Sequence, residues 1–83
     1  MQQFEFHAYR GDDEGVIAES PDITFARLSG DSAARAKAGR MSRRINGPVD
    51  LAIAGAADWN DRYLTTASPS EYHSTGYRFE RLA

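Results

Sequence analysis

The chain has 83 residues, a formal net charge of −2 and a sequence pI near 5.6, and it contains no cysteine. This length predicts a single domain, 1–83, that buries roughly 60–65% of its unfolded surface and has little room for a deep active-site pocket. The lack of cysteine excludes disulfides, thiol catalysis and zinc sites with sulfur ligands.

The first 28 residues predict three short strands. Residues 4–9 alternate between apolar and polar side chains, which is the period of a half-buried strand. Residues 16–20 resume an extended pattern after a turn rich in glycine and acid, so we expect a β-hairpin over 3–20. Pro21 interrupts this hairpin because proline cannot donate to a ladder, and 23–28 follows as a third strand.

Residues 31–46 predict one amphipathic helix. Small polar residues with good capping propensity precede it, and Asn46-Gly47-Pro48 ends it. At 100° per residue, a narrow apolar stripe forms on one side from Ala34, Ala38, Met41 and Ile45. We expect this stripe to pack against a sheet.

The second half of the chain is predicted to be mainly extended. A strand is expected at 49–54, and 55–61 is expected to connect it, with one helical turn, to the next strand. Two β-rich runs, 62–67 and 77–82, flank the polar segment 68–76, parts of which extend these strands. The predicted fold class is therefore α+β, in the order βββαβββ: an antiparallel sheet of five or six strands with one helix packed on one face.

Residues 15–36 resemble the N-terminal domain of the HicB antitoxin family. Members show a glycine-led strand followed by Pro-Asp-Leu and then by Gly-Asp-Thr at the start of a helix. The matching residues here are Gly15, Pro21-Asp22-Ile23 and Gly30-Asp31-Ser32, at the family's spacing. The resemblance implies a ββαβ-type core and a role in binding another small protein. The chain departs from the family after the helix, where no operator-binding segment follows, and in the helix itself, which is basic.

The predicted helix carries a concentrated positive charge on an otherwise acidic chain. Residues 29–48 have a net charge of +4, against −4 for 1–28 and −2 for 49–83. The cations are Arg35, Lys37, Arg40, Arg43 and Arg44. They are candidates for contacting nucleic-acid phosphates. The alternative is a solvated helix face whose arginines pair with nearby acids.

Aromatic side chains suggest a second surface. Four phenylalanines are expected to point into the core: Phe4, Phe6, Phe25 and Phe79. Tyrosines on the sheet face opposite the helix would be left exposed, and such a face, or a strand edge, suits a protein partner or a second copy of the chain. Tyr63 and Tyr77 are our candidate contact residues there.

No pattern in the chain indicates catalysis, a metal site or a cofactor. His7 and His73 have no ligand spacing, and the acidic turn 12–14 lacks the spacing of a calcium loop. His7 with Glu19 is the one acid–base pair that the predicted hairpin would bring together. We therefore expect a non-enzymatic binding protein, acting through a protein partner or self-association, with a nucleic-acid-binding module as the alternative.

The composition also indicates where such a protein occurs. Nine arginines against one lysine, together with thirteen alanines, indicate a GC-rich coding sequence of bacterial type. Residues 1–7 lack the pattern of a signal peptide, and no apolar run approaches the roughly 20 residues that span a bilayer. We therefore expect a cytoplasmic protein with no membrane partner.

Overall fold

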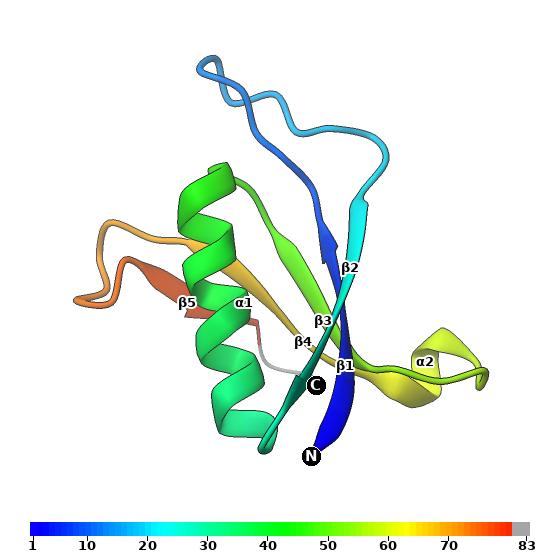
Figure 1. The fold of residues 1–83 in the computed structure, drawn as a ribbon. Coiled ribbons are helices and arrows are strands. Elements are labelled where there is room, and N and C mark those ends of the chain that lie inside the picture. The colour runs from blue at the N-terminus through cyan, green and yellow to red at the C-terminus, as the bar shows by residue number, and fades with distance from the viewer. Residues whose placement is uncertain (81–83) are drawn as a thin grey trace.

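The computed structural model describes residues 1–80 and confirms the α+β fold (Figure 1). Five strands form one antiparallel sheet in the order β2-β1-β3-β4-β5. In chain order the elements are β1 (Gln2–Ala8), β2 (Asp22–Leu28), α1 (Asp31–Ile45), β3 (Val49–Ile53), α2 (Trp59–Arg62), β4 (Tyr63–Pro69) and β5 (Tyr77–Phe79). No helix in this part of the chain is long and apolar enough to cross a membrane.

The predicted strand at 16–20 is wrong. β1 pairs instead with β2, from Gln2 opposite Leu28 to Ala8 opposite Asp22, and 9–21 is a long connection that extends beyond the end of the sheet (Figure 1). A seven-residue partner gives β1 a complete ladder, whereas 16–20 contributes only an isolated bridge through Ile17. The order is therefore ββαβαββ, and the sheet has five strands, within the expected range.

α1 begins and ends where the sequence predicts, but its caps differ in detail. Gly30 is the N-cap, and no side chain caps the first turn. At the other end Asn46, not Gly47, takes the left-handed conformation, with φ 53°. Gly47 is needed for close approach: a Cβ there would lie 2.0 Å from the Tyr9 carbonyl oxygen.

The core lies between α1 and one face of the sheet. The predicted helix stripe is buried there, except that Met41 is only partly buried. Fully buried sheet residues that meet the stripe are Phe4, Phe6, Val49, Leu51 and Ala67. Among the four phenylalanines expected in the core, Phe79 packs at its margin, and Phe25 is 55% exposed. The prediction for Phe25 is therefore wrong.

The second half matches the prediction more closely. β3 lies within the predicted strand, and α2 is the expected helical turn in the connection, capped by the Asp58 side chain, which accepts from the Asn60 amide. β4 extends through Pro69 into the polar segment. β5 is shorter than the predicted strand at 77–82, whose last two residues lie outside the described part of the chain.

Candidate interaction surface

β2 is the least covered strand of the sheet. α1 packs mainly on β4 and β3 and hardly reaches β2, which lies at one edge (Figure 1). Five of its seven residues are exposed, Ile23 by 51% and Phe25 by 55%. We call the sheet face turned away from α1 the outer face. Because Phe4 and Phe6 face the helix and Phe25 pairs with Glu5, the side chains of Ile23 and Phe25 lie on the outer face.

The hydrogen bonds of β1 show which main-chain groups of β2 face outward. Ala54 N donates to Gln3 O, and Tyr9 N donates to Pro48 O, so the odd-numbered residues of β1 bond to β3. Consecutive residues of an antiparallel strand bond to opposite sides, so the even-numbered residues of β1 bond to β2. The paired residues of β2 are then also even-numbered.

The odd-numbered residues of β2 therefore direct their amides and carbonyls away from the sheet. These residues are Ile23, Phe25 and Arg27. Within residues 1–80 no backbone or side-chain group bonds to them from outside the sheet. We call this row of unpaired N–H and C=O groups the open edge. Its backbone groups and its exposed apolar side chains belong to the same residues, as in strands that accept another strand.

β5, at the other edge of the sheet, is protected. It has only three residues. Glu80 N donates to Thr66 O, so Tyr77 and Phe79 face outward by the same alternation. The Thr75 hydroxyl donates to Tyr77 O at 2.9 Å and accepts from Tyr77 N at 3.4 Å. The side chain of Thr75 thus satisfies the main chain of Tyr77, and within residues 1–80 only Phe79 of β5 keeps unpaired outward groups.

Beside the open edge, the outer face carries a cluster of polar side chains built around Glu5. Arg62 Nη1 donates to Glu5 Oε1 at 2.8 Å, and His7 Nε2 lies 2.5 Å from Glu5 Oε2. All three side chains are 11–16% exposed. The Trp59 ring covers the cluster, with its centre 4.4 Å from that of His7 and 5.3 Å from the Arg62 guanidinium. The cluster fastens α2 to β1.

Glu5 stays ionised in this cluster. Burial by itself raises the pKa of its carboxyl group, but hydrogen bonds from His7 and Arg62, with the positive charge of Arg62, outweigh burial and hold the pKa below that of an ordinary glutamate. Both carboxylate oxygens have partners, so neither is free to take a proton from a substrate.

The predicted site residue Tyr63 lies on the outer face and is half-buried. Its hydroxyl is 2.5 Å from the Thr66 hydroxyl, which donates to Asp50 Oδ1 at 2.5 Å. The other predicted tyrosine, Tyr77, lies on the opposite face against α1, where a Cβ on Gly39 would come within 2.4 Å of its ring. The structure therefore does not bring the two tyrosines together.

The helix cations also point in different directions. Lys37 is half-buried, with its ammonium 5.8 Å from the centre of the Phe6 ring, and Arg43 lies beside Gly76 of the β4–β5 connection. Arg40 and Arg44 are exposed. In the part of the chain that the structure describes, no carboxylate lies within 4.0 Å of any cation of α1. The pairing with nearby acids that we considered is absent there.

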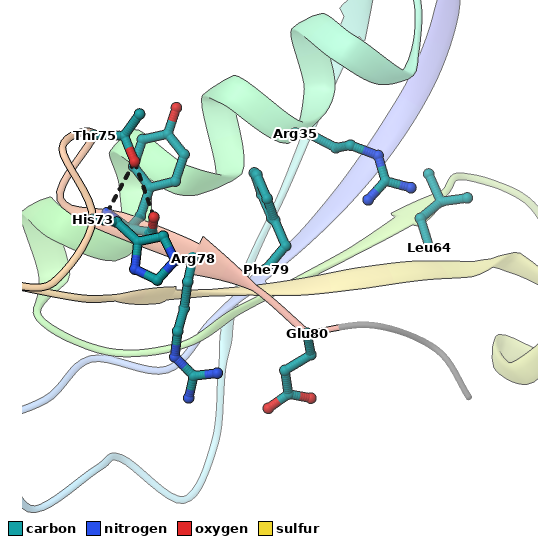
Figure 2. A pocket seen from close by; sticks show the side chains of 8 residues that line it. Arg35, Leu64, His73, Thr75, Arg78, Phe79 and Glu80 are labelled. Atoms are coloured by element: carbon teal, nitrogen blue, oxygen red, sulfur yellow. Dashed lines mark hydrogen bonds between the residues drawn. The ribbon is translucent and has the colours of Figure 1, made fainter.

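Arg35 borders a surface hollow of about 780 Å³ beside β5 (Figure 2). Figure 2 shows Arg35 extending from α1 toward Leu64, and Phe79 pointing toward the helix, whereas Arg78 and Glu80 point to the other side of β5. Arg35 therefore lies on the other side of β5 from Arg78 and Glu80. This hollow therefore lacks the convergence of groups that a catalytic site requires.

The sequence does not assign the open edge to β2, and it gives no direct sign of the cluster around Glu5. Glu5 and His7 are two residues apart in a strand, so a shared face was predictable. Arg62, 57 residues from Glu5, could be found only from the structure. The proposed pair of His7 with Glu19 does not form, because Glu19 lies exposed in the 9–21 connection.

We found no family model, curated protein or solved structure that matches this chain.

Proposed function

We propose that this chain is a non-enzymatic binding protein that acts through a protein partner or a second copy of itself. The observation that carries the proposal is the open edge of β2, where unpaired main-chain groups coincide with the exposed side chains of Ile23 and Phe25. An exposed apolar edge strand is a template for another strand. The main-chain bonds of such an added strand supply affinity, and its alternate side chains supply specificity.

The arrangement of charged groups also favours binding over catalysis. The most buried carboxylate, Glu5, has partners on both oxygens, and Arg35 lies on the other side of β5 from Arg78 and Glu80. The resemblance to HicB antitoxins adds a more specific proposal, an antitoxin-like inhibitor of a small protein in the bacterial cytoplasm. The order of β1, β2, α1 and β3 supports it, whereas the turn and irregular chain at 15–20 do not.

A peptide library tests the open edge without assuming a partner. Random 12-residue peptides displayed on phage are selected on the wild-type protein and depleted on Phe25→Lys, which places a charge on the outer face of β2. We expect enriched peptides that alternate apolar and polar residues and bind the wild type. Tyr72→Lys, which removes an aromatic side chain 90% exposed in the β4–β5 connection, should bind them equally well.

Two results would contradict this proposal. One is a protein that stays monomeric at every concentration and for which the library yields no peptide able to distinguish the wild type from Phe25→Lys. The other is a set of peptides whose binding depends on Tyr72 and not on Phe25.

Binding of nucleic acid by α1 is the second candidate, supported by the unpaired cations described above. Arg40, Arg43 and Arg44 are exposed and have no acidic partner within residues 1–80. Fluorescence anisotropy with labelled single-stranded and double-stranded oligonucleotides at two salt concentrations tests it. This candidate predicts binding that weakens as salt rises and is lost in the double variant Arg40→Glu/Arg44→Glu. No binding at low salt would exclude it.

A further inference from the structure

We propose that the strand added to the open edge of β2 is β2 of a second copy, so that the sheet continues through ten strands in a two-fold symmetric dimer. This inference rests on the proposed function and names its partner. The reason is that β2 is complementary to itself in backbone hydrogen bonding, side-chain type and charge.

Backbone geometry restricts how two β2 strands can pair. Residues directly opposite each other in an antiparallel pair either both point their main-chain groups toward the partner or both point them away. Only Ile23, Phe25 and Arg27 point outward, so each must lie opposite another member of this set. Among the registers that meet this condition, the one with Phe25 opposite Phe25 of the second copy pairs all seven residues of β2.

The side chains are compatible with this register. In this register Ile23 is placed opposite Arg27 of the second copy, whose aliphatic stem can cover it, and Asp22 is placed opposite Leu28. β2 carries one negative and one positive residue, and this register places no two like charges opposite each other. The two Phe25 rings meet on the two-fold axis, where an aromatic pair removes from water the large side chain that the monomer leaves 55% exposed.

The geometry also determines the arrangement of the two subunits. Opposed residues share a face of the sheet, so both α1 helices lie on one side and the outer faces join on the other. α1 packs over β3 and β4 and so leaves β2 accessible (Figure 1). The outward groups of Ile23, Phe25 and Arg27, unpaired in the monomer, then gain main-chain partners. A symmetric contact of this kind closes on itself and produces a dimer, not a fibre.

Light scattering across a concentration series measures the dimer. We expect a two-fold increase in mass for the wild type, with the dissociation constant raised roughly tenfold to hundredfold in Phe25→Lys, because the ring is then no longer buried between the copies. Tyr72→Lys should dimerise like the wild type.

Cysteine pairs test the register, and the chain has no native cysteine to interfere. We mix separately purified Ile23→Cys and Arg27→Cys under mild oxidation. The proposed register places these positions opposite each other, at a Cα separation of about 5.5 Å, which suits a disulfide. The mixture should give a cross-linked heterodimer, identified by its mass. Ile23→Cys alone should not cross-link, because its two copies lie roughly 13 Å apart. Arg27→Cys mixed with Tyr72→Cys is the control for random collision.

Each outcome separates this inference from the proposed function. A monomer at every concentration overturns the dimer. If the protein is monomeric but library peptides bind in a Phe25-dependent manner, the proposed function still stands, because an unrelated strand occupies the open edge. If the protein is monomeric and no such peptide binds, the dimer and the proposed function are both wrong. A disulfide formed by Ile23→Cys alone, or equal cross-linking in the collision control, overturns the register.

Discussion

The two edges of this sheet differ in how their main-chain groups are satisfied. β5 is three residues long. The Thr75 hydroxyl is hydrogen-bonded to both the amide and the carbonyl of Tyr77, whose ring packs on α1. β2 is seven residues long, lies largely outside the cover of α1 and presents Ile23 and Phe25 to solvent. Because edge protection is a local property, one sheet can have a closed edge and an open one. The open edge is where association is expected.

The largest effect should come from proline substitutions at two neighbouring residues of β2, one whose amide faces β1 and one whose amide faces outward. Thr24→Pro removes a donor to β1 and should lower the free energy of unfolding by about 3 kcal/mol. Ile23→Pro removes an outward amide, so its fold should be nearly intact while association is lost. Urea denaturation at a concentration where the protein is monomeric compares the two variants. Equal destabilisation would show that the assignment of inward and outward groups is wrong.

The next effect concerns the cluster behind the open edge. Glu5→Gln should lower the free energy of unfolding by about 2 kcal/mol at neutral pH, since it weakens the hydrogen bonds to Arg62 and His7. The pKa of Glu5 is lowered in the folded state, so its contribution is present above the pKa of an unfolded glutamate and is lost as pH falls through the lower, folded value.

Urea denaturation of the wild type and Glu5→Gln from pH 7 down into the acid range measures this contribution. The difference between the two proteins should shrink as pH falls. Glu14→Gln, in the exposed turn, is the matched control and should follow the wild type at every pH. A constant difference between the wild type and Glu5→Gln would contradict the role assigned to the carboxylate.

Gly39→Ala tests how α1 supports the closed edge. The added Cβ would meet the Tyr77 ring at 2.4 Å, so either this ring or the helix must shift. We expect a net loss of about 1.5 kcal/mol, because the clash exceeds the gain in helix propensity. Thermal denaturation measures it, with Ala36→Gly as a control for propensity alone. An increase in stability would show that Tyr77 moves away at no cost.

Thr75→Val should have the smallest effect. It removes the hydroxyl that bonds to Tyr77 and keeps a similar volume, so the free energy of unfolding should fall by about 1 kcal/mol. The Tyr77 amide should exchange its hydrogen faster by more than the roughly fivefold increase that the loss of global stability gives at the core amide of Phe6. If the Tyr77 amide exchanges at the wild-type rate, Thr75 does not protect this edge.

Local pattern was sufficient to predict α1, β3 and α2, because each has its own periodicity or cap. It predicted the strand β2 but not its partner, because 16–20 and 22–28 are both plausible strands and only pairing with β1 selects the longer one. It failed again at Phe25. Alternation within β2 shows that Ile23 and Phe25 share a face, but which face depends on the register with Glu5 and His7. β2 thus carries apolar residues on both faces: Ala26 and Leu28 pack against the core, whereas Ile23 and Phe25 lie outside it and mark the candidate surface.

The strand order has a consequence for the growing chain during synthesis. β1 lies between β2 and β3, so a nascent chain can form the β1–β2 hairpin before the second partner of β1 has been made. At roughly 5–20 residues per second, Thr75 follows β2 by several seconds. A hairpin formed in this interval presents its open side before Thr75 has been made. The protected edge is completed last.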